Sequence, residues 1–323
     1  MLQEIINSKY EKKPAILIGN GINRITNKNL SWDGVLDNLI KVSDRAQIRK
    51  GNKPLTFLFE EILHSMEGAA TRGNEQKLKE IVADAIDKAL QPNDLHEKFM
   101  NLNIQHFFTP NYDYCLEKAV DPYFKKTYKK KQRGESKKYS FSRYNEVKGK
   151  FIWHIHGELD NGLIDERNNY KEKSIMLGFD QYMRTLVDMS QLLNNGSYRN
   201  LPGKQTLEEV FSELLNIETT NRSWFSFFFT TNIHIIALDL GLFETHLWWL
   251  LHYRKKLAAR KELTYRNRII YYVSPFQKLS KQDHLELLRS LDVNITEVEC
   301  AFNEGNFYRE FYENAYKLIS LSL

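Results

Sequence analysis

The chain has 323 residues, of which 42% are hydrophobic and 27% charged, and this balance excludes a disordered, collagen-like or low-complexity protein. A net charge of +5 is too small to indicate a nucleic-acid binder without a local cluster of cations. The two cysteines, Cys115 and Cys300, form no CxxC pair, so neither a structural zinc site nor a disulfide framework is expected. These features, with no signal peptide and no apolar run of about 18 residues, favour a cytoplasmic protein without a membrane span.

Apolar runs separated by helical stretches predict a parallel sheet. Strands are expected, in chain order, at 14–19, 104–109, 151–156, 233–240, 268–273 and 293–300. Leu, Ile and Val recur at three- and four-residue spacing over 54–101, which predicts amphipathic helices. The apolar stretch 224–251 is interrupted by polar residues and is interpreted as a buried strand followed by a helix. Strands that alternate with helices predict a Rossmann-like, doubly wound α/β fold.

The whole chain, 1–323, is interpreted as one domain. Residues 161–230 contain no clear strand and are expected to form a helical insertion over an edge of the sheet. Aromatic residues at helical spacing in 301–323 predict a C-terminal helix that packs on the core or forms an oligomer interface. The basic segment 125–138 could hold a phosphate backbone, but a solvated loop is the preferred interpretation, so a nucleic-acid partner is not expected.

Three motifs at strand ends carry the candidate chemistry. The first, Gly19-Asn20-Gly21-Ile22-Asn23, would let backbone N–H groups approach a diphosphate, although such turns are also ordinary tight connections. The second, Thr109-Pro110-Asn111-Tyr112-Asp113, places polar side chains at the carboxyl edge of the sheet, where open α/β folds bind ligands, or simply forms a turn.

The third motif, Trp153-His154-Ile155-His156-Gly157, also ends a strand. His156 is followed by Gly, so its imidazole is expected to be reachable and able to act as a general base near neutral pH. His154 is interpreted as structural. The two histidines could ligate a metal together, but no matching carboxylate or cysteine cluster is visible in the sequence, so no metal site is predicted.

In this order, GNGIN, TPNYD and the His-Gly of HIHG resemble the sirtuin-like family, whose corresponding patterns are GAGIS, TQNID and HG. The resemblance extends to the strand and turn at 235–241 and to the Glu and His-Leu-Trp-Trp-Leu-Leu that follow. The absence of a zinc-binding CxxC pair resembles the bacterial sirtuin-like NAD hydrolases of anti-phage defence more than the protein deacylases.

This resemblance implies that NAD is the substrate, split into nicotinamide and ADP-ribose during abortive infection. It places Gly19, Asn20 and Gly21 at the diphosphate, and Asn23 near the nicotinamide ribose. It also implies that Asn111 contacts the ribose hydroxyls or the attacking water, that Asp113 holds the nicotinamide amide, and that His156 acts as the base.

In the strand and turn at 235–241 the family usually has Gly and Ser before a Leu, and two residues of this chain depart from that pattern. Ala237 and Asp239 stand there, and Asp239 would repel the diphosphate unless a cation pairs with it. A subunit that binds NAD or ADP-ribose without cleaving it therefore remains the alternative. Because unrestrained NAD hydrolysis would kill the host, the resemblance also implies a homo-oligomer or a separately encoded regulatory subunit, either a HerA-like ATPase or a nucleotide-sensing protein.

Overall fold

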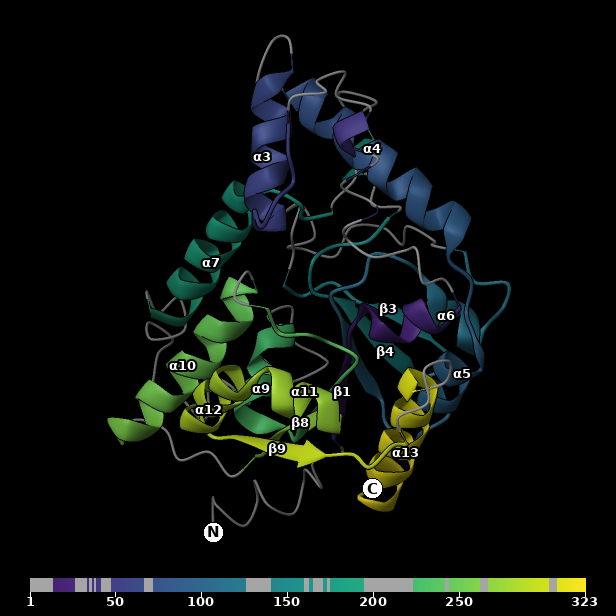
Figure 1. Cartoon of the computed structure of the whole chain (residues 1–323), viewed down its shortest axis with the longest axis vertical. Helices are drawn as coiled ribbons and strands as arrows, with labels where there is room; N and C mark the ends of the chain where they lie inside the picture. The colour runs from purple at the N-terminus through teal and green to yellow at the C-terminus, as the bar shows by residue number, and fades with distance from the viewer. Residues whose placement is uncertain are drawn as a thin grey trace, which may run out of the picture.

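A computed structural model gives the fold over residues 14–26, 34, 37, 39–41, 48–66, 72–125, 141–159, 163–164, 171–172, 175–194, 223–241, 244–261, 267–301 and 307–323. Seven strands of this part form one sheet in the order β3-β4-β2-β1-β7-β8-β9 (Figure 1). The strands are β1 (Ala15–Ile18), β2 (His106–Thr109), β3 (Asn145–Val147), β4 (Lys150–His154), β7 (Ile233–Ile236), β8 (Ile269–Val273) and β9 (Val293–Glu297). All neighbouring pairs are parallel except β3 and β4, so the fold is Rossmann-like, as predicted.

Helices connect the parallel strands. They are η1 (Asn20–Ile25), α3 (Leu55–Ser65), α4 (Arg72–Ala89), α5 (Asp94–Met100), α6 (Cys115–Val120), α7 (Phe179–Asn194), η2 (Trp224–Ser226), α9 (Phe227–Thr230), α10 (Thr245–Ala259), α11 (Pro275–Ser280), α12 (Gln282–Ser290) and α13 (Phe307–Leu321). In the described residues, no helix is both long and apolar enough to cross a bilayer.

The central strand β1 is buried on both faces because its apolar residues alternate between two cores. Ala15 and Leu17 pack with side chains of α9, α10 and α12 on one face. Ile16 and Ile18 pack with side chains of α5, α6 and α13 on the other. Two helical layers thus cover the sheet, which explains why the strand has no polar residue.

The six predicted parallel strands are all present, as are helices over 54–101 and the strand and helix within 224–251. The antiparallel edge strand β3 was not predicted. Nor were β5 (Leu163–Ile164) and β6 (Lys171–Glu172), which form a separate two-stranded sheet inside the segment expected to be helical. Strands of two or three residues are too short to give an alternating pattern.

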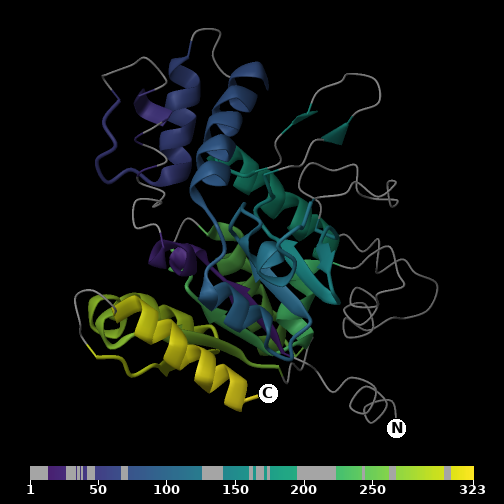
Figure 2. The same ribbon diagram turned by 90° about the vertical axis from the view of Figure 1, so that its right-hand side faces the viewer.

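Helices α3 and α4 form a lobe at the carboxyl edge of the sheet. Side chains of α3 and α4 form a third core with Tyr112, Tyr114 and Leu159, which follow the ends of β2 and β4. Figures 1 and 2 show α3 and α4 at the end of the molecule opposite α13. Of the predicted insertion 161–230, the structure describes only 163–164, 171–172, 175–194 and 223–230, and the rest lies outside the described residues. Helix α7, within this part, contacts α3 and α10.

The predicted C-terminal helix is α13. Its aromatic residues Phe311 and Tyr312 are buried against the sheet, and Tyr316 packs beside them, whereas Tyr308 is half exposed. Core packing therefore accounts for most of the aromatic stripe. The basic segment 125–138 lies, beyond Lys125, outside the described residues.

Candidate functional site

Four neighbouring parallel strands, β4, β2, β1 and β7, end at the same edge of the sheet, and each is followed by polar residues of the candidate site. The chain runs from β1 to β2 on one side and later reaches β7 on the other side of β1. Open α/β sheets bind ligands where the strand order reverses in this way. The predicted residues 19–23, Asn111, Asp113 and His156 all follow the ends of these strands.

The glycines of the first motif allow η1 to approach the turn after β7. The N–H of Gly21 donates to the carbonyl of Ala237, and that of Gly19 donates to Ile236. A Cβ on Gly19 would lie 2.5 Å from Cα of Leu238, and one on Gly21 would meet the Tyr312 hydroxyl and the Ala237 carbonyl. Close packing of two chain segments therefore requires these glycines, whether or not a diphosphate binds there.

Asn23 and Asp113 are joined directly. The side-chain amide of Asn23 donates to Asp113 Oδ2 at 2.9 Å and to Asn20 Oδ1 at 2.9 Å. Asn23 Oδ1 lies 2.8 Å from Nε2 of His96, whose Nδ1 accepts the N–H of Asn93. Burial lowers the pKa of His96 to about 4 despite the negative charge of Asp113, so the ring is neutral and Nε2 donates to Asn23.

These contacts give Asn23 and Asp113 a structural role, because they connect η1 to the start of α6. Asn23 is fully buried, and Oδ1 of Asp113 accepts the N–H of Cys115 at the start of α6. His96, which orients the Asn23 amide, was not among the predicted site residues. Its only signal in the sequence is its place in the Asn93–His96 capping box of α5.

Asn111 is held by its backbone. Its N–H donates to the Thr109 hydroxyl at 3.1 Å, and its carbonyl lies 2.7 Å from Nδ1 of His154. The Asn111 residue is 8% exposed. Both bonds involve only the backbone of Asn111 and not its side-chain amide.

His154 is structural, as predicted, and belongs to a buried charged network. Its Nε2 lies 2.8 Å from Oε1 of Glu117, and Asn145 bridges Glu117 to Glu158 with bonds of 2.7 and 2.8 Å. Burial opposes the charged imidazole, but the charge and hydrogen bond of Glu117, with help from Glu158, raise the pKa of His154 to about 9. The protonated ring can therefore donate both to Glu117 and to the Asn111 carbonyl.

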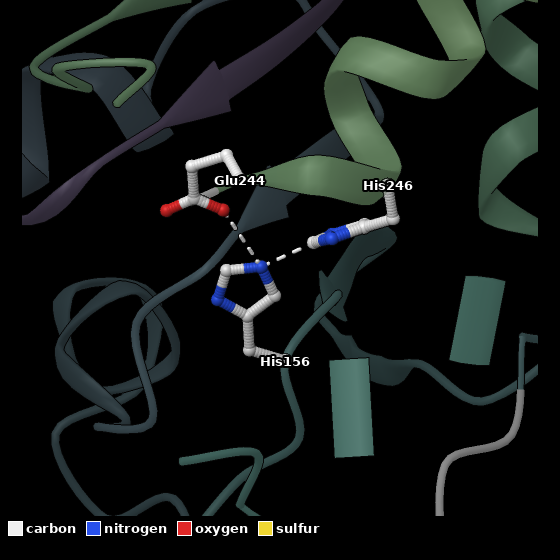
Figure 3. Close-up of side chains that lie close together, drawn as sticks. All are labelled: His156, Glu244 and His246. Atoms are coloured by element: carbon white, nitrogen blue, oxygen red, sulfur yellow. Dashed lines mark hydrogen bonds and ion pairs between the residues drawn. The ribbon is translucent and has the colours of Figure 1, made fainter. Parts of the chain in front are cut away.

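His156 meets two residues from the start of α10, which Figure 3 shows pointing toward its ring. Its Nε2 lies 3.1 Å from Oε2 of Glu244 and 3.1 Å from Nε2 of His246. Its Nδ1 lies 3.3 Å from the Tyr182 hydroxyl. His156 is only 2% exposed, so the prediction of a reachable imidazole is wrong: Tyr182 and His246 pack edge-on against its ring.

The two histidines of the HIHG motif contact different residues, His154 on the Glu117 side and His156 on the Glu244 side. They do not form a shared metal site. Instead, His156, Glu244 and His246 are a group whose donor atoms all lie within 4.8 Å of one another. Glu244 and His246 were not predicted as site residues, although a Glu-x-His sequence after a strand end was a visible signal.

Asp239 belongs to neither of these clusters. Its side chain is 64% exposed and forms an ion pair with Lys281 at the start of α12. Lys281 supplies the cation that could offset repulsion between Asp239 and a diphosphate. The turn around it is unusual, since Ala237 and Leu240 both have positive φ angles, 57° and 47°.

Residues 105–221 match the family model of the SIR2-like domain. This range includes Asn111, Asp113 and His156, and excludes the glycine turn at 19–23 and Glu244. A search of curated proteins finds no match to the chain. The family match supports a sirtuin-like domain here and, with it, an activity related to NAD.

Proposed function

We propose that this chain hydrolyses NAD at the bond between nicotinamide and ribose, releasing nicotinamide and ADP-ribose. One observation carries the proposal: Asn111 and His156 stand at equivalent positions just beyond the ends of two paired strands. Thr109 of β2 pairs with His154 of β4, and Asn111 and His156 each follow two residues later, within the matched SIR2-like range. A side-chain amide and a buried imidazole thus belong to adjacent strand ends.

These two groups suit the reaction. Departure of neutral nicotinamide leaves a ribosyl centre with oxocarbenium character, which water attacks at C1′ while one proton leaves. His156 accepts that proton, and Glu244, 3.1 Å away, stabilises the positive charge that the imidazole gains. The Asn111 amide orients the ribose or the water, and cannot itself take the proton.

The glycine turn and Asn20 complete the proposed NAD site. Asn20 is half-buried, and η1 follows β1 at the switch point of the sheet, where a diphosphate would be expected. In the structure Asn23 is saturated by His96, Asn20 and Asp113. We therefore assign Asn23 and Asp113 a structural role, which is to fix the position of η1 relative to α6. Asn20 and Asn111 are the residues proposed to contact NAD directly.

The test is NAD consumption by the purified chain and four variants. Asn111→Ala and His156→Ala are expected to lower turnover about 10²- to 10⁴-fold, the usual contribution of a positioned acid or base. Asn101→Ala and His252→Ala replace exposed residues of the same types and should keep wild-type turnover. Circular dichroism checks that each variant is folded. Bound but uncleaved NAD in every mixture would favour the non-catalytic alternative.

We extend this proposal to anti-phage defence, with the activity restrained by self-assembly or by a separate regulatory subunit. The support is the motif resemblance described above and the need of any NAD-degrading protein to be inactive in a healthy cell. Light scattering combined with NAD turnover tests the restraint. An isolated monomer with full turnover and no effect of phage infection on cellular NAD would contradict it.

A further inference from the structure

His156, Glu244 and His246 bring three buried donor groups from distant parts of the chain to one point (Figure 3). Their exposed fractions are 2%, 6% and 0%. We propose that these three side chains bind a divalent transition-metal ion of the zinc class. Two imidazoles and one carboxylate are a ligand set that zinc accepts, and calcium or magnesium would instead require mainly oxygen ligands.

Hydrogen bonding alone cannot satisfy the three groups. Nε2 of His156 carries at most one proton, yet it lies 3.1 Å from both Glu244 Oε2 and His246 Nε2. A proton shared between the imidazoles leaves Oε2 of Glu244 buried without a hydrogen bond, as the structure shows among the described residues. Such a carboxylate oxygen is costly to bury. A dication at the centre would satisfy all three donor atoms at once.

The spacing of the donor atoms also fits a metal. Ligand atoms about 2.0–2.1 Å from a tetrahedral zinc ion lie about 3.3 Å apart. The two 3.1 Å separations at His156 are close to that value, and no pair of donor atoms exceeds 4.8 Å. Three ligands leave a fourth position of the tetrahedron for water or a ligand.

The surrounding residues hold the ligands in place. The hydroxyl of Tyr182, on α7, lies 3.3 Å from Nδ1 of His156, the kind of second contact that fixes a ligand ring and leaves Nε2 for the metal. Glu244 immediately precedes α10 and His246 is its second residue, so one rigid helix start presents both. Trp224 and Tyr182 pack against the His246 ring.

Metal binding has a consequence that rests on the proposed function. The ion occupies the Nε2 lone pair of His156, which the general base needs to accept a proton. Metal-loaded protein is therefore inactive toward NAD, and removal of the metal releases the base. The site would then act as an inhibitory control at the catalytic residue.

The direct test measures binding without NAD. Full-length protein is freed of metal with a chelator and titrated with Co²⁺, whose visible absorption reports tetrahedral coordination, and with Zn²⁺ by calorimetry. We expect one equivalent to bind wild type and His252→Ala, which alters an exposed histidine of the same helix. Glu244→Gln and His246→Ala should weaken binding by more than 10-fold.

A further variant keeps the test decisive if His246→Ala does not fold. His246→Cys retains a ligand, and is expected to bind Co²⁺ with a new sulfur-to-metal charge-transfer band. Absence of one-equivalent binding to wild type, or equal binding by Glu244→Gln and wild type, would overturn the metal site. Neither result depends on NAD cleavage, so a failure here is distinct from a failure of the hydrolase proposal.

Discussion

Glu117 is the residue on which the buried network behind Asn111 depends. Glu117→Gln removes the charge that keeps His154 protonated, and the variant should lose about 3 kcal/mol of unfolding free energy at pH 7, as when one partner of a buried ion pair is deleted. Urea unfolding measures this loss. The exposed Glu146→Gln on strand β3 is the matched control and should be near neutral. Equal stability of the two variants would contradict the role assigned to Glu117.

The same ion pair predicts how stability depends on alkaline pH. The pKa of His154 is raised to about 9 in the folded protein, against 6.5 for an unperturbed histidine. A raised pKa stabilises the fold fully below pH 6.5, and this contribution is lost as pH rises through about 9. Urea unfolding of the wild type from pH 6 to 10 should show that loss. NMR titration of His154 near 6.5 would contradict it.

Gly19 is required because of its surroundings and not because of its backbone angles. Its φ is −90°, which any residue adopts, but a Cβ would meet the backbone of Ala237 and Leu238. Gly19→Ala should therefore destabilise the protein by about 2 kcal/mol or more through displacement of backbone. Gly51→Ala is the control: its φ is +50° with open space around it, so about 1 kcal/mol of strain is expected. Thermal unfolding that ranks Gly51→Ala as the more damaging would contradict this explanation.

Helix α5 links the glycine turn to the rest of the fold through its N-cap, Asn93. The side chain of Asn93 accepts the N–H groups of Leu95 and His96, and also donates to the carbonyl of Ile22 in η1. Asn93→Ala should cost about 2 kcal/mol, because it loses the cap and the link to η1 together. Asn93→Asp keeps the cap acceptor and loses only the donor, so it should cost less. Urea unfolding of both variants measures the difference, and equal losses would contradict the link.

Secondary structure was predictable where the sequence repeats a pattern over several turns or strand residues. β1 and β8 are buried on both faces and therefore form continuous apolar runs, and α3 and α4 show helical spacing. β3 was missed because its sequence, Asn-Glu-Val, has no apolar run, and Asn145 is buried there by hydrogen bonds to Glu117 and Glu158. The place of α3 and α4 at the carboxyl edge was not predicted, because amphipathic spacing does not show which end of a sheet a helix covers.

For the whole molecule, neutral buried histidines predict loss of stability in acid. Burial lowers the pKa of His96 and of His234 to about 4, and lowers that of His246 well below its usual value. A depressed pKa leaves the fold most stable above pH 6.5, and stability falls as pH drops toward 4, by about 1.4 kcal/mol per pH unit for each fully responding group. Calorimetry from pH 7 to 4.5 tests this. His234→Gln should flatten the dependence, and an unchanged slope would contradict the assignment.

The candidate site was predictable in part, because polar residues after strand ends meet at one edge of a parallel sheet. That rule led to Asn111, Asp113 and His156. The same rule could not show that His156 is buried or that Glu244 and His246 contact its ring. Those contacts depend on the direction of α10, which follows the turn in which Ala237 and Leu240 have positive φ angles. Nor could the rule show that Asp239 turns outward to Lys281.

The proposed NAD-cleaving site lies at the ends of β2 and β4. Proton NMR of NAD incubated with the metal-free chain, together with its regulatory partner where one co-purifies, follows substrate and products in one sample. Nicotinamide and ADP-ribose are expected to appear in equal amounts, and His156→Ala should slow the appearance of both about 10²- to 10⁴-fold. NAD that remains intact with the wild-type protein, or is cleaved equally by His156→Ala, would contradict the proposal.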